Sequence, residues 1–247
     1  CMCVRERMAV RGGGGGKRRA PAPEYVLRGH VDPVMTCTFL QETLVTGDQQ
    51  GVLRAWDVHH TFRSLHETQL GGALLQLQAA PSQPVLLLQR RYSRPSVLAV
   101  DAHSLDGDSP LWSLGHDAPQ DGDTGSFCRA CWLGQELVLA PSPTHASQAQ
   151  LWDPRASCVD PAGCTGFEGK SRGAGMLMCL CADEGCFSAG FENGEVALFD
   201  VRELSKPLQV RTVSQEPVLS LCLCKDWLFV GGVGCGIHRM SSCDLSP

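Results

Sequence analysis

The chain has 247 residues, of which 43% are hydrophobic and 19% are charged, and its formal net charge is −5. These values indicate a folded globular chain and exclude wholesale disorder. The negative balance argues against nucleic acid or anionic lipid as partners, and no apolar run approaches the ~20 residues that a membrane-spanning helix needs.

The N-terminal stretch has a composition of its own. Residues 1–23 contain five consecutive glycines at 12–16, followed by the basic triplet 17–19 and an Ala-Pro repeat. Such a segment buries too little apolar area to offset its ordering entropy, so we expect a disordered tail over 1–23 and one folded domain over 24–247. No apolar signal-peptide region follows the basic residues, which predicts a cytoplasmic and nuclear protein whose 14 cysteines are reduced thiols.

Short apolar runs separated by Gly, Pro, Asp and Ser follow from residue 24 onward, and helical periodicity does not persist. This pattern predicts many short β-strands, as in a sandwich, a barrel or a propeller. The expected strands are Val34–Leu40, Thr43–Thr46, Val52–Val58, Val85–Leu88, Val97–Val100, Glu136–Leu139, Gln150–Trp152, Met176–Cys181, Glu195–Val201, Val218–Cys224 and Trp227–Val230.

An internal repeat selects among these folds. Aromatic-Asp pairs begin at Trp56, Trp152 and Phe199, and the first interval is about twice the second. A missing copy is expected near residue 100, where Val97–Asp101 stands, and a degraded fifth copy near 240, at Gly236–Met240. A period of about 40–50 residues is typical of propeller blades.

The Gly29-His30 pair, the turn before a strand ending in Trp56-Asp57, and the repeat length resemble WD40 repeats. The resemblance implies an all-β WD40 β-propeller with four-stranded blades. About five blades are recognisable. The usual ring has seven, so we expect a C-terminally truncated ring. The resemblance also implies that Tyr25–Leu27 is the outer strand that closes the last blade, although its usual partner strands are absent from this sequence.

A second alignment places three inner strands in register. Met35–Phe39, Leu177–Cys181 and Ser220–Cys224 each precede a turn and a strand, and their cysteines are expected at equivalent positions.

The structural motif of the repeats supplies the candidate site residues. A well-kept WD repeat holds a buried His, Ser or Thr, Asp and Trp network, and such a network rigidifies only when every member is satisfied. Gln50 occupies the expected Asp position in the first repeat, with Asp48 two residues earlier, and Asn193 occupies it in the fourth, so we expect an incomplete or rewired network. The motif residues are Gly29, His30, Thr46, Trp56, Asp57, Trp152, Asp153, Phe199 and Asp200.

Other patterns favour structural roles over chemistry. The cysteines of Cys128-x-x-Cys131 and of the 179–186 stretch lack the paired spacing of a zinc site and are expected to be small packing residues. No histidine lies in a catalytic motif, and the glycines at 71–72 and 231–236 are expected in turns because no helix pattern follows them. We therefore expect no enzyme activity, metal, cofactor or small-molecule substrate. The acidic stretch Leu105–Ser126 is expected to be an exposed insertion, either a solvated loop or a docking surface for a basic partner.

Three segments carry a closer resemblance: Tyr25–Gly29 with Pro33-Val34, Ala189–Val201, and Glu216–Val218. They resemble the ASTRA-associated protein 1 family, also called G-protein β-subunit-like protein 1. The resemblance implies a non-catalytic adaptor that binds other proteins in the chaperone-linked maturation of phosphatidylinositol-3-kinase-related kinases and in chromatin remodelling. It supplies no binding residues. Two alternatives remain open: a generic WD40 adaptor, such as a ubiquitin-ligase substrate receptor or a G-protein β-like subunit, and an enzyme built on a propeller.

Overall fold

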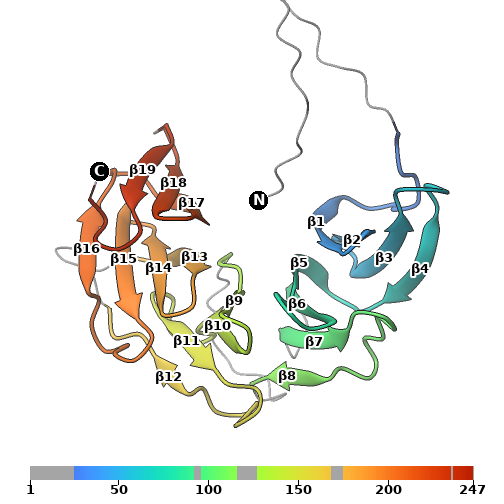
Figure 1. Cartoon of the computed structure of the whole chain (residues 1–247), viewed down its shortest axis with the longest axis horizontal. Coiled ribbons are helices and arrows are strands. Elements are labelled where there is room, and N and C mark those ends of the chain that lie inside the picture. The colour runs from blue at the N-terminus through green and yellow to red at the C-terminus, as the bar shows by residue number, and fades with distance from the viewer. Residues whose placement is uncertain (1–24, 92–95, 116–126, 168–174, 235, 247) are drawn as a thin grey trace, which may run out of the picture.

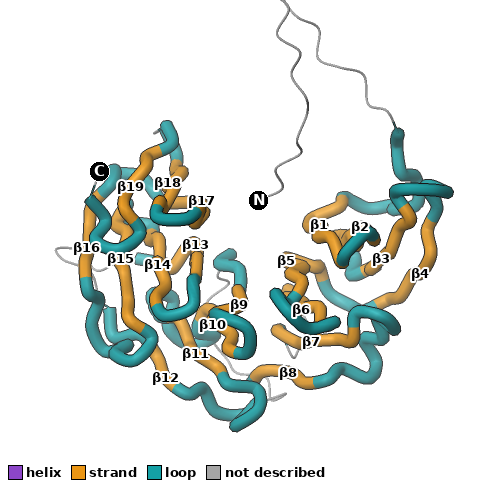
Figure 2. The backbone as a smooth tube through the Cα atoms, viewed as in Figure 1, coloured by secondary structure: helices purple, strands orange, loops and turns teal. Residues whose placement is uncertain are grey.

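The computed structural model describes residues 25–91, 96–115, 127–167, 175–234 and 236–246. This part of the chain folds into strands and loops and contains no helix (Figure 2). The strands form antiparallel sheets in which neighbours along the chain are also neighbours in space. The expected tail over 1–23 lies outside the described residues.

Each sheet is a meander of consecutive strands. The first contains β1 (Val34–Leu40), β2 (Thr43–Asp48), β3 (Val52–Asp57) and β4 (Ser64–Gln69), and the second contains β5 (Ala73–Ala79), β6 (Val85–Arg91), β7 (Val97–Asp101) and β8 (Trp112–Leu114). The third contains β9 (Cys131–Leu133), β10 (Leu137–Pro141), β11 (Ala149–Trp152) and β12 (Gly163–Cys164). The fourth contains β13 (Leu177–Ala182), β14 (Cys186–Phe191), β15 (Glu195–Asp200) and β16 (Gln209–Thr212), and the fifth contains β17 (Val218–Cys224), β18 (Trp227–Gly232) and β19 (His238–Ser241).

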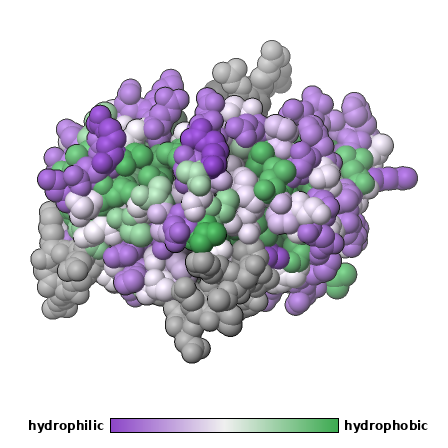
Figure 3. Space-filling model, turned by 90° about the horizontal axis from the view of Figure 1, so that it is seen from below, coloured by the Kyte–Doolittle hydropathy of each residue, from purple (hydrophilic) through white to green (hydrophobic). Residues whose placement is uncertain are grey.

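The five sheets stand around a common centre as an arc (Figure 1). The first strand of each sheet lies nearest the centre, and the outer strands β4, β8, β12 and β16 form the rim. This is the arrangement of a β-propeller. Seen from below, apolar residues gather along the middle of the rim between hydrophilic edges (Figure 3).

A shared irregularity shows that the sheets repeat one another. The pairing of the first and second strands shifts register between Val34 and Thr36, between Leu74 and Gln76, between Leu177 and Cys179, and between Val218 and Ser220. A bulge at the same place in four sheets re-aims the inner strand in the same way each time.

The strands at the centre of the sheets are largely buried on both faces. In β6, Leu86 and Leu88 pack toward the first sheet, whereas Val85 and Leu87 pack toward the third. Successive strand residues point to opposite faces, so a continuous apolar run predicts a strand covered on both sides. Four such clusters of buried side chains join the five described sheets, each linking one sheet to the next.

The arc is open. Figure 1 leaves a gap between β17–β19 and β1–β4, and no buried cluster joins these two sheets within the described part of the chain. Large apolar side chains are exposed on both terminal sheets, among them Met35, Leu65, Leu219 and Ile237. The expected ring of seven blades stays a prediction.

Three expectations from the sequence are wrong. Cys37 pairs with Thr46, whereas Cys179 pairs with Gly190 and Cys222 with Phe229, so the cysteines occupy different register positions. The shared bulge fixes the true alignment, in which Cys179 matches Thr36 and Ser220.

The second correction concerns the supposed insertion over Leu105–Ser126. Leu105 is buried in the core between the first two sheets, and Trp112–Leu114 forms β8. The acidic part at 116–126 lies outside the described residues.

The third correction concerns Tyr25–Leu27, which forms no strand in the structure. Tyr25 stacks on Phe62, with ring centroids 3.7 Å apart, and this contact holds the segment beside the first sheet instead of the last. The fifth sheet has three described strands.

Polar side chains also cross from sheet to sheet. The amide of Gln89, which is 5% exposed, donates to the carbonyl of Cys128 over 2.9 Å and accepts from the backbone N–H of Ala130 over 2.8 Å. Gln89 therefore satisfies two backbone groups that enter β9 without a strand partner.

Replacing Gln89 with Leu should lower the free energy of unfolding by about 2–4 kcal/mol, because two buried backbone groups lose their partner. Urea denaturation followed by tryptophan fluorescence measures the change. Gln83→Leu, at an exposed turn position, is the matched control, and equal effects of the two variants would contradict the assignment.

Candidate functional site

The most connected polar group of the first sheet joins four side chains from three segments. His30 lies 2.7 Å from Asp48 through Nδ1 and 2.7 Å from Thr46 through Nε2. The indole N–H of Trp56 donates to the Thr46 hydroxyl over 2.7 Å. Asp48 accepts from the backbone N–H groups of Gln50 and Val52 with its other oxygen. The network thus ties the loop before β1 to the β2–β3 turn.

The protons of this network follow from its donors and acceptors. In the tautomer that satisfies every partner, His30 Nδ1 donates to Asp48, and Nε2 accepts from the Thr46 hydroxyl. The Thr46 hydroxyl is 3.5 Å from the carbonyl of Arg54, a much longer contact. Every member is satisfied in this arrangement, and satisfied buried networks rigidify their surroundings.

The order Thr46, His30, Asp48 has the connectivity of a nucleophile, a base and an orienting acid. Its setting favours structure over catalysis. Thr46 is 7% exposed, and its hydroxyl already accepts the Trp56 N–H.

The Trp56 ring is held between two neighbours. A Cβ on Gly29 would lie 2.7 Å from the ring, so only glycine lets this loop cross it so closely. On β3, the Arg54 guanidinium lies 5.9 Å from the ring centroid and pairs with Glu67 at 2.7 Å.

Two expectations about this network are wrong. Asp48, and not Gln50, is the acid, so the first network is complete; the sequence alignment missed it by two residues. In the fourth sheet the matching position is Phe191, whereas Asn193 lies in the turn, where it accepts from the backbone N–H of Glu195 and donates to the Glu195 carboxylate.

The equivalent positions in the other sheets have lost the network. Strand register matches Thr46 to Leu88, Ala140, Ala189 and Val230, and none of these carries a hydroxyl. Phe199 matches Trp56 and stacks on Phe187 at 5.0 Å, so it needs no acceptor. Trp152 also matches Trp56 but keeps its N–H, which has no hydrogen-bond partner.

The polar residues that end the third strands all cap the turn that follows. Asp57 accepts from the backbone N–H groups of His59, His60 and Thr61. Asp101, Asp153 and Asp200 accept in the same way from the residues that follow them, and Ser241 does so in the fifth sheet. These side chains cap the turn that follows the third strand, a role that short polar side chains take in turns.

The caps lower the pKa of these carboxyl groups. Hydrogen bonds from the Arg202 side chain and backbone lower the pKa of Asp200 to about 2, and the Arg155 side chain lowers that of Asp153. Backbone N–H groups hold the pKa of Asp57 and of Asp101 below the ordinary value. All four carboxylates are therefore ionised near neutral pH.

The cysteines singled out by the sequence are packing residues. Burial raises the pKa of Cys131 and of Cys179 to about 12 and raises that of Cys128, so these thiols stay protonated. The cysteines that the structure describes are free thiols, and the described residues contain no group of three or more potential metal ligands. Within the same residues no helix is long and apolar enough to cross a membrane. Gly231 and Gly232 lie in β18 instead of a turn.

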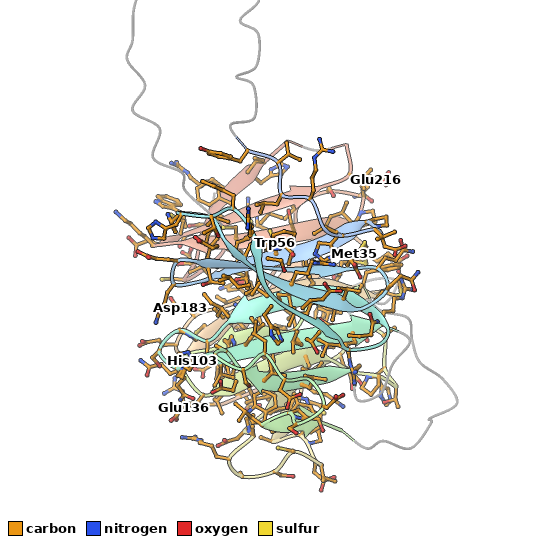
Figure 4. The ribbon with its side chains drawn as sticks, turned by 90° about the vertical axis from the view of Figure 1, so that its right-hand side faces the viewer. Met35, Trp56, His103, Glu136, Asp183 and Glu216 are labelled. Carbon is orange, nitrogen blue, oxygen red and sulfur yellow. The ribbon has the colours of Figure 1, made fainter. Side chains whose placement is uncertain are left out.

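Exposed carboxylates gather at one face of the disk. Figure 4 shows Glu136, Asp183 and His103 at one edge, and Met35 and Glu216 at the opposite edge. Glu136 and Asp183 lie in turns between the first and second strands of their sheets. The turns at the same place in the other sheets add Glu42 and Asp226, and Glu184 follows Asp183. The hairpins nearest the centre thus present an acidic face, formed by Glu42, Asp183, Glu184 and Asp226; Glu136 is paired with Arg155, and Lys225 lies beside Asp226.

Sequence reasoning missed this acidic face, because its members are single residues far apart in the chain. The sequence placed Asp48 two residues before the expected acid without assigning it to the network, and it missed the pair Gly115-His116, which repeats Gly29-His30. His116 lies outside the described residues.

Comparison with known proteins identifies the fold and no family. No protein-family model matches the chain. The crystal structure of the computationally designed Ika8 protein is similar, with a TM-score of 0.65 and 14% identity over 87% of this chain and 60% of that one. A chain in the structure of the COPII coat assembled on membranes has a TM-score of 0.71 and 12% identity over 87% of this chain and 33% of that one. The chain thus spans less than two thirds of either structure.

Replacing Thr46 with Val keeps the shape of the side chain and removes the hydroxyl. Trp56 and His30 then lose their shared partner, so the free energy of unfolding should fall by about 2–3 kcal/mol. The indole N–H signal of Trp56 should also move in a ¹H–¹⁵N spectrum. Thr43→Val on the same strand is the control, and an unmoved indole signal in Thr46→Val would refute the network.

Replacing Arg202 with Ala should raise the Asp200 pKa from about 2 toward its ordinary value of 3.8. A carboxyl group with a depressed folded pKa stabilises the fold above its unfolded pKa and loses this contribution as the pH falls through the folded value. The variant should therefore lose less stability than the parent between about pH 4 and pH 2. Carboxyl NMR titration and thermal unfolding measure both quantities, and an unchanged Asp200 titration contradicts the assignment.

Proposed function

We propose that this chain is a non-catalytic protein-interaction scaffold whose acidic face binds a basic partner surface. The observation that carries the proposal is the convergence of Glu42, Asp183, Glu184 and Asp226 on the central hairpins of one face. These side chains are exposed and belong to short turns between packed strands. Charges fixed on a rigid frame steer and orient a complementary partner.

The structural roles of the polar side chains support the absence of catalytic activity. The buried His30 and Asp48 complete a structural network, and the aspartates that end the third strands cap turns. No cofactor, nucleic acid or small-molecule substrate enters this proposal.

We propose further that the sheets are WD40 blades and that the partners are proteins of the kinase-maturation assembly, in the cytoplasm and nucleus. Support comes from the complete Thr46–His30–Asp48–Trp56 network and from the segments resembling the ASTRA-associated protein 1 family. The acidic face selects partners whose surface carries positive charge.

Affinity purification of the tagged full-length protein from cells, with mass spectrometry of the captured proteins, tests both levels. The triple variant Glu42→Gln, Glu184→Gln, Asp226→Asn should lose most of the captured partner, and capture by the parent should weaken with rising salt. Kinase-maturation subunits should be among the partners.

The matched control neutralises three acids away from that face: Asp32→Asn, Glu192→Gln and Glu216→Gln. It changes the net charge equally and should retain the partner. Equal loss in the two triple variants would overturn the binding face, and capture without kinase-maturation subunits would overturn the partner assignment alone.

A further inference from the structure

The strand β19 has a strand partner on one side only. In each of the first four sheets the third strand pairs with the second strand and with a fourth, as β15 does with β14 and β16. In the fifth sheet β19 pairs with β18, and the described part of the chain places no strand along its other edge. In Figure 1 β19 lies farther from the centre than β17 and β18, so the open edge faces outward.

The main-chain groups of alternate β19 residues face this open edge. The N–H of Ser241 points toward it, because it donates to the carbonyl of Ser246 over 2.6 Å. The matching N–H of Asp57 donates in the same way to the residue before β4. Main-chain groups of a strand alternate between its two neighbours, so Arg239 and Ile237 also direct their N–H and C=O groups to the open edge.

The side chains along this edge are accessible, and two of them are basic. Ile237 is 79% exposed, and His238 and Arg239 are exposed as well. The Arg239 guanidinium lies 4.2 Å from the centroid of the Trp227 ring, which holds its charge beside the strand. An edge that carries such charges disfavours pairing with the same edge of a second copy.

The other sheets show which residues suit a fourth strand at these positions. Leu114 of β8 stands opposite Val97, the residue that matches Ile237. In the first sheet Glu67 of β4 stands opposite Arg54 of β3 and pairs with it at 2.7 Å. Cross-strand pairs of opposite charge stabilise a sheet, so an acid on a fourth strand suits a guanidinium on the third.

We propose that the outer edge of β19 binds an extended acidic segment of a partner protein, which adds a fourth strand to the sheet. An acidic residue of this segment lies opposite Arg239, and an aliphatic residue two positions later lies opposite Ile237. This spacing follows from antiparallel pairing, in which residues two apart on one strand stand opposite residues two apart on the other, as in β15 and β16. Main-chain hydrogen bonds supply the affinity of strand addition, and alternate side chains supply its specificity.

The test titrates the ¹⁵N-labelled full-length protein with the blocked peptide acetyl-Thr-Glu-Thr-Leu-Thr amide. The amide signals of Arg239 and Ile237 should move downfield and saturate, and their hydrogen exchange should slow at least tenfold. The same peptide with N-methyl groups on Glu and Leu keeps every side chain but cannot pair along the edge. It should therefore bind at least tenfold more weakly.

A reversal of charge tests the choice of an acidic segment. Arg239→Glu should weaken binding of this peptide at least tenfold and should favour the peptide in which Lys replaces Glu, and this gain also shows that the variant is folded. Arg129→Glu, which makes the same change of charge at an exposed position before β9, should leave both affinities unchanged. The triple variant of the acidic face should bind the peptide as the parent does, so the two proposals can fail separately.

Three results would overturn the proposal. The first is equal binding of the N-methylated peptide, or amide signals of Arg239 and Ile237 that the peptide never moves. The second is slow exchange of these two amides in the free protein, because the chain itself would then cover the edge. The third is a shift of these signals with protein concentration alone, which would assign the edge to a second copy.

Discussion

Face-to-face packing of apolar sheets is the interaction on which the rest of this structure depends. Each central strand contributes alternate residues to two cores, as Val85 and Leu87 do toward the third sheet and Leu86 and Leu88 toward the first. Burial of apolar area dominates the folding energy, and it is not directional. The orientation of each sheet against the next is set by polar groups that cross between segments, such as the Gln89 amide with the backbone of Cys128 and Ala130. It is also set by the bulge shared by four inner strands.

Several strands that the sequence predicts, such as β6, β7 and β15, are those in which this two-sided burial leaves an apolar run. Val34–Leu40 and Val218–Cys224 are strands with the expected bounds, and β3, β7, β11 and β15 lie within a residue of expectation. The outer strands escape prediction for the opposite reason: β4 is almost wholly exposed along its length, so its residues carry no apolar pattern. Such a strand can be recognised only from its hydrogen-bonded pairing with the neighbouring strand.

Most residues of the His30 network can be predicted from the sequence, but their arrangement in space cannot. His30, Thr46 and Trp56 are recognisable by spacing, and the structure brings all three together. The acid escaped because spacing alone does not tell whether residue 48 or 50 turns its side chain inward. Only the paired register of β1 and β2 places Asp48 opposite Val34, at the start of the inner strand. The loss of the network in later sheets has a chemical pattern too: Phe199 needs no acceptor, whereas Trp152 still does.

The open arc has a consequence for how the molecule comes apart. Each sheet touches only its neighbours, so the arc behaves as a short one-dimensional stack in which the stability of a unit depends on how many of its faces are covered. Among the described residues, the second, third and fourth sheets have two partners, whereas the first and fifth have one. Opening therefore starts at the two ends and moves inward, and amide protons of β6 and β10 exchange more slowly than those of β2 and β18. An added surface that covers either terminal sheet would stabilise the whole stack, because it removes the place where fraying begins.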